Sequence, residues 1–189
     1  MKRQKEEIKA IIFDIGGVIV ENPKYKEFWN NVDGSSKLRE DFGTRRITTK
    51  EFIREGSRLL NISQKQFLKE YKESYWTGEL ISSVFNIFKS IKIKKYILSD
   101  TNPLHQQYLK RRFPEIFKLS NKVFLNLRKS NPKSLKVVIK RIKLSPNHII
   151  FIDDKKEIVT LARSLGINAI LFDNTKELKK ELLNFGVKI

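Results

Sequence analysis

The stretch that decides the fold is Ile11-Ile12-Phe13-Asp14-Ile15-Gly16-Gly17-Val18-Ile19. In it an apolar run ends at a carboxylate, and two glycines follow. A charge at the end of a buried strand is costly without a partner, so Asp14 is expected to be ion-paired, to bind a metal ion, or to act as a nucleophile. The glycines allow a tight turn and a close approach of the backbone to a ligand.

Five short runs rich in Ile, Phe, Leu and Val are expected to be strands, and they span residues 9–15, 94–99, 123–126, 148–152 and 168–172. Strands that are apolar on both faces are typical of a parallel sheet covered on two sides. Helical patterns separate the runs, so the sequence predicts a doubly wound α/β sheet. The functional site of such a sheet lies at the carboxyl ends of its strands, where the strand order reverses.

Local signals predict where several helices begin and end. These are Asn131 before Pro132, Thr175 as the cap of the last helix, a stop at Gly166, and capping boxes at Thr48 with Glu51 and at Ser63 with Gln66. Residues 22–90 show only helical periodicity and no convincing strand. We interpret them as an inserted helical cap on a core made of residues 1–21 and 91–189. Aromatic residues are expected to form the core of this cap: Phe28, Trp29, Phe52, Phe67, Tyr75 and Trp76.

Composition sets limits on function. The 39 Lys and Arg exceed the 21 Asp and Glu and give a net charge of +18, which suits a nucleic-acid or anionic-membrane partner. The basic residues are interleaved with apolar ones at amphipathic spacings, so solvated helix faces are the favoured interpretation. The chain has no Cys, which excludes disulfides, Cys-ligated metals and thiol catalysis. No apolar run is long enough for a signal peptide or a membrane span, so a cytoplasmic protein without a membrane partner is expected.

Three other strand ends carry chemical groups. Asp153-Asp154 follows an apolar run, and adjacent carboxylates favour a divalent cation such as Mg²⁺; the alternative is that one of them caps the next helix. Ser99-Asp100-Thr101-Asn102 and Arg128-Lys129 end two more runs and contain groups that bind phosphate. Taken singly, these two are also ordinary turn and surface residues.

The order Asp14, Ser99, Lys129, Asp153-Asp154, together with the helical insertion, resembles the four motifs and the cap of the haloacid dehalogenase superfamily. Details such as Leu98-Ser99-Asp100-Thr101-Asn102 with His105, and Pro114-Glu115-Ile116 before Arg128-Lys129, resemble its glucose-1-phosphatase-like branch. The resemblance covers nearly the whole chain and implies a Rossmann-like core.

The resemblance also implies roles. Asp14 would attack phosphorus to form an aspartyl-phosphate, with Ser99 and Lys129 as the other catalytic residues. The phosphate-binding residues would be Gly17, Ser99, Asp100, Asn102 and Lys129. Mg²⁺ would be held by Asp14, the Gly16 carbonyl and Asp154, with Asp153 beside it. The cap would select the substrate.

The sequence departs from the family pattern at four places. Gly16 stands where most of these phosphatases have a second Asp, which serves as the general acid and base; Glu21, Asp33 and His105 are candidates to replace it. Asp100 replaces the branch's Asn and would repel phosphate unless turned away. The helix after Lys129 is delayed to Pro132, and Ile158 replaces a polar residue near the metal. His148 is expected to be a surface or packing residue.

The favoured hypothesis is therefore a Mg²⁺-dependent phosphatase, a monomer or homodimer, that acts on a small phosphorylated metabolite such as a sugar phosphate. A dehalogenase is a second possibility inside the family, but it needs no metal. The alternative from another class is a catalytically weakened protein of the same fold that binds RNA or a protein through its basic surface. Gly16 and Asp100 favour this alternative, and the intact Asp14, Ser99, Lys129 and Asp154 oppose it.

Overall fold

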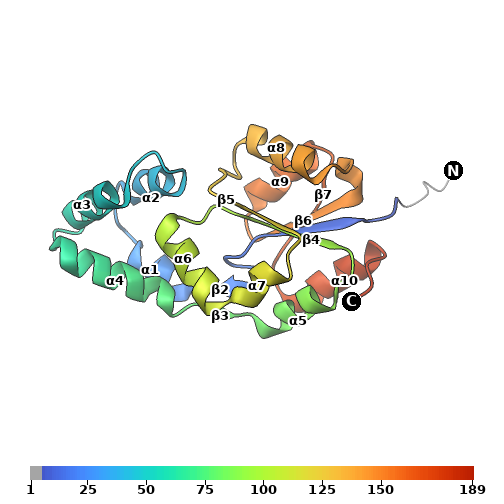
Figure 1. Cartoon of the computed structure of the whole chain (residues 1–189), viewed down its shortest axis with the longest axis horizontal. Coiled ribbons are helices and arrows are strands. Elements are labelled where there is room, and N and C mark those ends of the chain that lie inside the picture. Colours follow the sequence, from blue (N-terminus) through green and yellow to red (C-terminus); the bar gives the residue numbers. More distant parts are fainter. Residues whose placement is uncertain (1–5) are drawn as a thin grey trace.

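A five-stranded parallel sheet lies at the centre of the computed structural model, which describes residues 6–189 (Figure 1). Its strands are β1 (Ala10–Phe13), β4 (Lys94–Ser99), β5 (Lys122–Leu125), β6 (Ile149–Asp153) and β7 (Asn168–Leu171), in the order β5-β4-β1-β6-β7. All four neighbouring pairs are parallel. The predicted doubly wound α/β sheet is confirmed. The strand order reverses at β1, so a site is expected at its carboxyl end.

Helices cover both faces of the sheet. Along β1, Ala10 and Ile12 pack in one apolar cluster with α8 (Pro132–Ile142) and α9 (Lys156–Ser164). Ile11 and Phe13 belong to the opposite cluster, which includes α5 (Ser82–Ser90), α6 (Pro103–Arg112), α7 (Pro114–Lys118) and α10 (Thr175–Asn184). A short 3₁₀ turn, Pro146–His148, precedes β6. Alternate side chains of one strand therefore face two separate layers, which explains why the strands are apolar throughout.

Most of the predicted helix boundaries are confirmed. Asn131 caps α8 through the amide of Lys133, and the capping box of Thr48 with Glu51 begins α3 (Thr49–Leu59). Gly166, in the left-handed conformation, follows the end of α9.

Two boundary predictions need correction. The cap of α10 is Asn174, not Thr175, because the amide oxygen one residue earlier accepts the Glu177 N–H. Ser63 caps α4 (Gln64–Trp76), but the side chain of Gln66 donates to Glu70 instead of closing the capping box.

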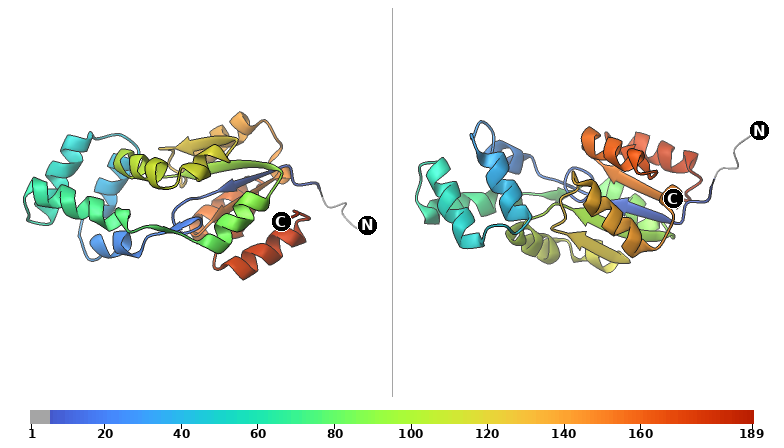
Figure 2. Two further views of the ribbon diagram at one scale, coloured as in Figure 1. Left: turned by 60° about the horizontal axis from the view of Figure 1, so that its bottom comes forward. Right: turned by 90° about the horizontal axis from the view of Figure 1, so that it is seen from above.

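Four helices inserted after β1 form a bundle at one end of the sheet (Figures 1 and 2). They are α1 (Pro23–Phe28), α2 (Ser35–Gly43), α3 and α4. A two-stranded antiparallel ribbon, β2 (Val20–Glu21) with β3 (Glu79–Leu80), joins the bundle to the core. The strand β3 could not be predicted from the sequence, because two residues are too short for any periodic pattern and their partner strand is distant along the chain.

Aromatic rings fill this bundle. Phe42 and Phe52 stack with centroids 4.0 Å apart, and Phe67 and Tyr71 stack at 5.8 Å. Of the aromatic residues expected in this core, Trp29, Phe52, Phe67 and Tyr75 are buried and Phe28 is partly buried. Trp76 was predicted wrongly: it is 58% exposed and stacks on Tyr108 of α6.

The division into core and cap, with its boundary at residue 90, stays a prediction. Residues 1–5 of the predicted core lie outside the part of the chain that the structure describes. The helix α5, which this division assigns to the cap, packs against α10 beside the sheet. Within residues 6–189, no helix combines the length and the apolar character that crossing a membrane requires.

Candidate active site

A buried lysine between two carboxylates forms the floor of the site. Asp14 directly follows β1, Asp153 ends β6, and Lys129 follows β5. The Lys129 Nζ lies 2.6 Å from Asp14 Oδ2 and 2.6 Å from Asp153 Oδ2, and all three side chains are buried. The two carboxylates raise the pKa of Lys129 although burial acts to lower it. Lys129 is therefore a permanent cation beside the proposed nucleophile. Although α8 begins only at Pro132, the Lys129 side chain still reaches Asp14.

Asp14 is held in a defined orientation. Its Oδ1 accepts a hydrogen bond from the amide N–H of Ile15 at 2.7 Å, while its Oδ2 forms an ion pair with the Lys129 ammonium. Asp153 is held in the same way, because its Oδ1 accepts the Lys155 N–H at 3.0 Å and its Oδ2 binds Lys129. Neither Asp153 nor Asp154 caps α9, which was the alternative role expected for one of them. The N-cap residue of α9 is Lys155, and no side chain forms a capping hydrogen bond.

The acidic groups fit a divalent cation. One carboxylate oxygen from each of Asp14, Asp153 and Asp154 lies within 4.8 Å of the others. Oδ1 of Asp154 is buried and has no hydrogen-bond partner. Oxygen-only donors suit Mg²⁺, and an unpaired buried carboxylate oxygen is costly unless a cation or a ligand satisfies it. Ile158, the departure expected to affect this region, is buried in the apolar layer under β6.

The two glycines after Asp14 differ. Gly17 has φ +79°, and a Cβ at this position would collide with the carboxylate of Asp154. Gly17 therefore permits both the turn and the close approach of Asp154. A Cβ at Gly16 meets no atom within 4 Å, and its φ is not in the left-handed region. The space beside Gly16 is open, so its missing carboxylate is not a consequence of crowding.

The residues after β4 are mostly engaged with the protein itself. Both oxygens of Asp100 accept the backbone N–H of Lys129, at 3.0 and 3.1 Å, so this carboxylate organises the Lys129 loop. Asn102 caps α6 by accepting the His105 N–H and donates to the Tyr71 hydroxyl of the bundle at 2.8 Å. Ser99, the last residue of β4, is buried and lines the same cavity. The phosphate-binding assignments of Asp100 and Asn102 stay predictions.

A cavity of about 450 Å³ opens above Asp14. The structure brings nearly all predicted site residues to it: Asp14, Gly16, Gly17, Ser99, Asp100, Asn102, Lys129 and Asp154. Asp153 is fully buried and is not among the residues that line the cavity. Glu21 and His105, two candidates for the missing acid, also line the cavity, whereas the third, Asp33, does not.

His105 is unusual among the lining residues. Its ring lies among three tyrosines, with centroids 5.1 Å from Tyr75, 6.0 Å from Tyr25 and 6.2 Å from Tyr108, and its Nε2 is buried without a partner. Burial lowers the pKa of His105 to about 4, although Asp14 acts to raise it. The imidazole is neutral at neutral pH and has an unused hydrogen-bonding atom. His148, by contrast, contacts the Glu7 carbonyl through Nδ1, away from the site.

Several lining residues were not predicted from the sequence, and four of them carry a hydroxyl group or a positive charge. Tyr25 and Lys26 come from α1, Arg39 from α2, and Lys155 directly follows Asp154. No local pattern marks the three bundle residues, because their place depends on how the bundle sits on the core. Hydrogen bonds and an ion pair fix this placement: the Tyr108 hydroxyl donates to the Trp76 carbonyl at 3.0 Å, and Arg128 pairs with Glu40 of α2 at 3.0 Å.

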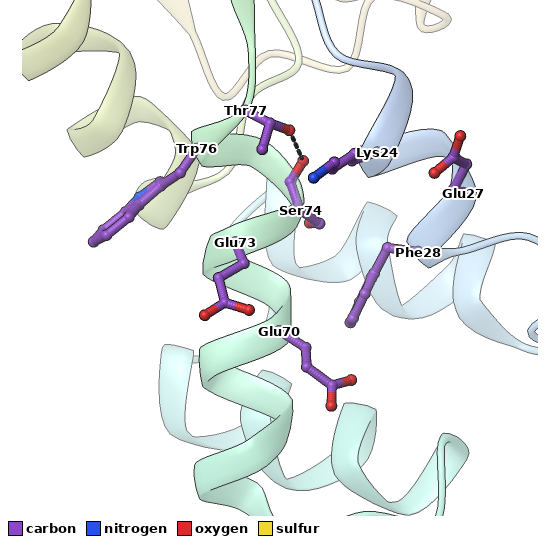
Figure 3. A pocket seen from close by; sticks show the side chains of 8 residues that line it. All are labelled: Lys24, Glu27, Phe28, Glu70, Glu73, Ser74, Trp76 and Thr77. Atoms are coloured by element: carbon purple, nitrogen blue, oxygen red, sulfur yellow. Dashed lines mark hydrogen bonds between the residues drawn. The ribbon is translucent and has the colours of Figure 1, made fainter.

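A second hollow lies on the outer side of the bundle, between α1 and α4 (Figure 3). Its lining includes Glu27, Glu70 and Glu73, one lysine, Lys24, and the exposed Trp76. None of the motif residues reaches it. The cavity above Asp14 is therefore the candidate active site.

This fold and this site define a haloacid dehalogenase-like hydrolase: the family model of that name matches residues 8–166, and the chain belongs to this family. In structure it is similar to a family enzyme of Bacteroides thetaiotaomicron, with a TM-score of 0.75 and 20% identity over 92% of this chain and 99% of the other. That enzyme is also known in complex with magnesium and inorganic phosphate. A predicted hydrolase of the same family from Porphyromonas gingivalis gives a TM-score of 0.75, with 20% identity over 94% of this chain and 98% of the other.

Among curated proteins, the chain is 26% identical over 212 residues to mouse acyl-CoA dehydrogenase family member 10. This match covers 92% of the chain but 19% of the mouse protein. The chain thus spans about a fifth of the length of this relative.

Proposed function

We propose that the chain is a Mg²⁺-dependent phosphomonoester hydrolase that acts on a small phosphorylated metabolite such as a sugar phosphate. The observation that carries this proposal is the buried Lys129 ammonium 2.6 Å from the Asp14 carboxylate, on the floor of the cavity. A lysine in this position places a positive charge where the negative charge of a phosphoryl group would gather. The magnesium and phosphate complex of the similar Bacteroides enzyme supports the same chemistry.

In the proposed reaction, a carboxylate oxygen of Asp14 attacks phosphorus, and the ester P–O bond breaks as the P–O bond to Asp14 forms. The departing oxygen takes a proton from water and leaves as an alcohol. Water then attacks the phosphorus of the aspartyl-phosphate, releases inorganic phosphate and restores Asp14. Ser99 and Lys129 bind the phosphoryl oxygens during both steps.

Asp14, Asp153, Asp154 and the carbonyl of Gly16 would hold Mg²⁺. When bound, the ion supplies positive charge that orients the phosphoryl group and offsets the repulsion between it and Asp14. Gly17 keeps Asp154 close enough to take part.

Gly16 gives the departing oxygen no carboxylic acid. General acid catalysis contributes about 10²–10⁴ in rate, so the test uses an aryl phosphate, whose leaving group needs little protonation. We expect Mg²⁺-dependent hydrolysis of para-nitrophenyl phosphate that is lost in Asp14→Asn and after removal of the metal with EDTA. Absence of turnover on this ester and on a broad panel of phosphorylated metabolites would contradict the proposal. Salt-sensitive RNA binding without turnover would favour a binding protein instead.

A further inference from the structure

A second chamber adjoins the cavity above Asp14. This chamber has a volume of about 340 Å³ and lies between α2 and the loop that carries Arg128. Five residues line both spaces: Tyr25, Arg39, Asp100, Asn102 and Lys155. Because the two spaces share these residues, a ligand whose phosphoryl group lies at Asp14 can extend past them into the second chamber. We call Arg39 and Lys155 the junction cations.

The junction cations have no carboxylate partner. Within residues 6–189, neither Arg39 nor Lys155 has a carboxylate oxygen within 4.0 Å, whereas Arg46, Arg54 and Arg58 of the same helical bundle each form an ion pair. Asp100 is the one carboxylate shared by both chambers, and both of its oxygens already accept the Lys129 N–H. Asp100 still interacts electrostatically with Lys155, but within residues 6–189 neither junction cation forms a close ion pair.

Arg39 is held in place for such a role. Its Nε donates to the Ser35 carbonyl at 3.3 Å, and its guanidinium lies 5.7 Å from the centre of the Trp29 ring. Trp29 is itself buried in the bundle. A guanidinium that is already oriented loses less conformational entropy when it binds an anion than a free side chain does.

The two junction cations come from different parts of the chain. Arg39 belongs to α2 of the bundle, and Lys155 follows β6 in the core. An anionic group between them would contact both the bundle and the strand end that carries Asp154. The main chain of Lys155 is fixed by its hydrogen bond to Asp153 at 3.0 Å.

We propose that the junction cations bind a second anionic group of the substrate, so that the preferred substrate is a phosphate monoester with a carboxylate or another phosphate at its far end. This proposal rests on the proposed function, because the first phosphoryl group must lie at Asp14. It narrows the substrate from any phosphorylated metabolite to one with two separated anionic groups.

Matched substrate pairs test the proposal. Glycerol 3-phosphate and 3-phosphoglycerate differ by a carboxylate, and fructose 6-phosphate and fructose 1,6-bisphosphate differ by a phosphate. We expect kcat/KM to be about tenfold or more higher for the doubly anionic member of at least one pair, mainly through a lower KM, as charge-assisted hydrogen bonds would give. The pair with the larger ratio identifies the anion.

Variants then assign the effect to the junction. In Arg39→Gln and Lys155→Gln the ratio of kcat/KM within the preferred pair should fall about tenfold, while Arg39→Lys should keep part of it. The matched control is Arg58→Gln, an exposed arginine of α3 outside both chambers, which should leave the ratio unchanged. Circular dichroism of each variant verifies folding, and Lys155→Gln keeps the test valid if Arg39→Gln does not fold, because the Lys155 side chain is exposed.

The outcomes separate the two proposals. If the native protein hydrolyses no phosphate ester, the proposed function fails. If it hydrolyses both members of each pair with equal kcat/KM, or if Arg39→Gln and Lys155→Gln keep the native ratio, the proposal of a second anionic group is wrong. The proposed phosphatase activity is then unaffected.

Discussion

The Lys129 ammonium lies 2.6 Å from the Asp14 carboxylate, and both side chains are almost completely buried. The same ammonium contacts Asp153, also at 2.6 Å. One cation therefore balances two buried anions. If the cluster binds Mg²⁺ as proposed, the stability of the fold depends on the metal.

Replacement of Lys129 by Met should expose this link. Without the ammonium, Asp14 and Asp153 would be buried side by side with no cation, and removing one partner of a buried ion pair costs about 3–5 kcal/mol. We expect the free energy of unfolding of Lys129→Met, measured with urea in EDTA, to fall by about 3 kcal/mol, and part of this loss to be recovered in Mg²⁺. The control is Lys180→Met, which removes an exposed ion pair on α10. Equal stability of Lys129→Met and the native protein in EDTA would contradict this view of the cluster.

Gly16 and Gly17 offer a comparison between neighbours. Gly17→Ala would place a methyl group on the Asp154 carboxylate at a positive φ, so we expect a loss of about 1–3 kcal/mol in the free energy of unfolding and a weaker dependence of stability on Mg²⁺. Gly16→Ala has open space and no positive φ, so its free energy of unfolding should equal or slightly exceed the native value. Urea unfolding of both variants, with and without Mg²⁺, provides the measurement. Equal effects of the two substitutions would show that Asp154 does not depend on Gly17.

The sheet and the floor of the site could be predicted from the sequence because both depend on local patterns. A strand that is buried on both faces shows a continuous apolar run, and the residues that end or follow this run lie at the carboxyl ends of the strands. This is why Asp14, Lys129 and Asp153, far apart along the chain, were placed together correctly. The N-cap Asn131 was predicted for the same reason, since capping depends on three or four consecutive residues.

The upper wall of the cavity could not be predicted, because it depends on packing between the helical bundle and the core. Nothing around Arg39 or Tyr25 distinguishes them from other surface residues of amphipathic helices. The exposure of Trp76 has the same origin: its ring stacks on Tyr108 outside the bundle instead of packing within it. The two carboxylate oxygens of Asp100 also accept the N–H of Lys129, 29 positions further along the chain, so this contact was not visible in the sequence.

The buried His105 should make stability depend on pH. Burial lowers its pKa from the ordinary value of 6.5 to about 4, so the unfolded chain binds a proton that the folded chain refuses. This contribution to stability, on the order of 3 kcal/mol, is fully present above pH 6.5 and is lost as the pH falls from 6.5 to 4. We expect the free energy of unfolding of His105→Gln to fall less than that of the native protein over this range. His148→Gln is the control and should keep the native slope, and identical slopes for His105→Gln and the native protein would contradict the inferred burial.

The open space at Gly16 allows a gain of function to be designed. Because a Cβ there meets no atom within 4 Å, an aspartate in Gly16→Asp should fit without rearrangement and supply the carboxylic acid that the departing oxygen lacks. General acid catalysis helps most when the leaving group is a poor one, so we expect kcat for an alkyl phosphate such as glycerol 3-phosphate to rise by about 10²-fold. The rate for para-nitrophenyl phosphate should change much less, since its leaving group departs with little protonation. Gly16→Asn is the matched control, because it has the same shape but no acidic proton, and it should give neither gain. If Gly16→Asp and Gly16→Asn behave alike on both esters, the proton reaches the departing oxygen from another group, and His105 and Glu21, which line the same cavity, become the residues to replace next.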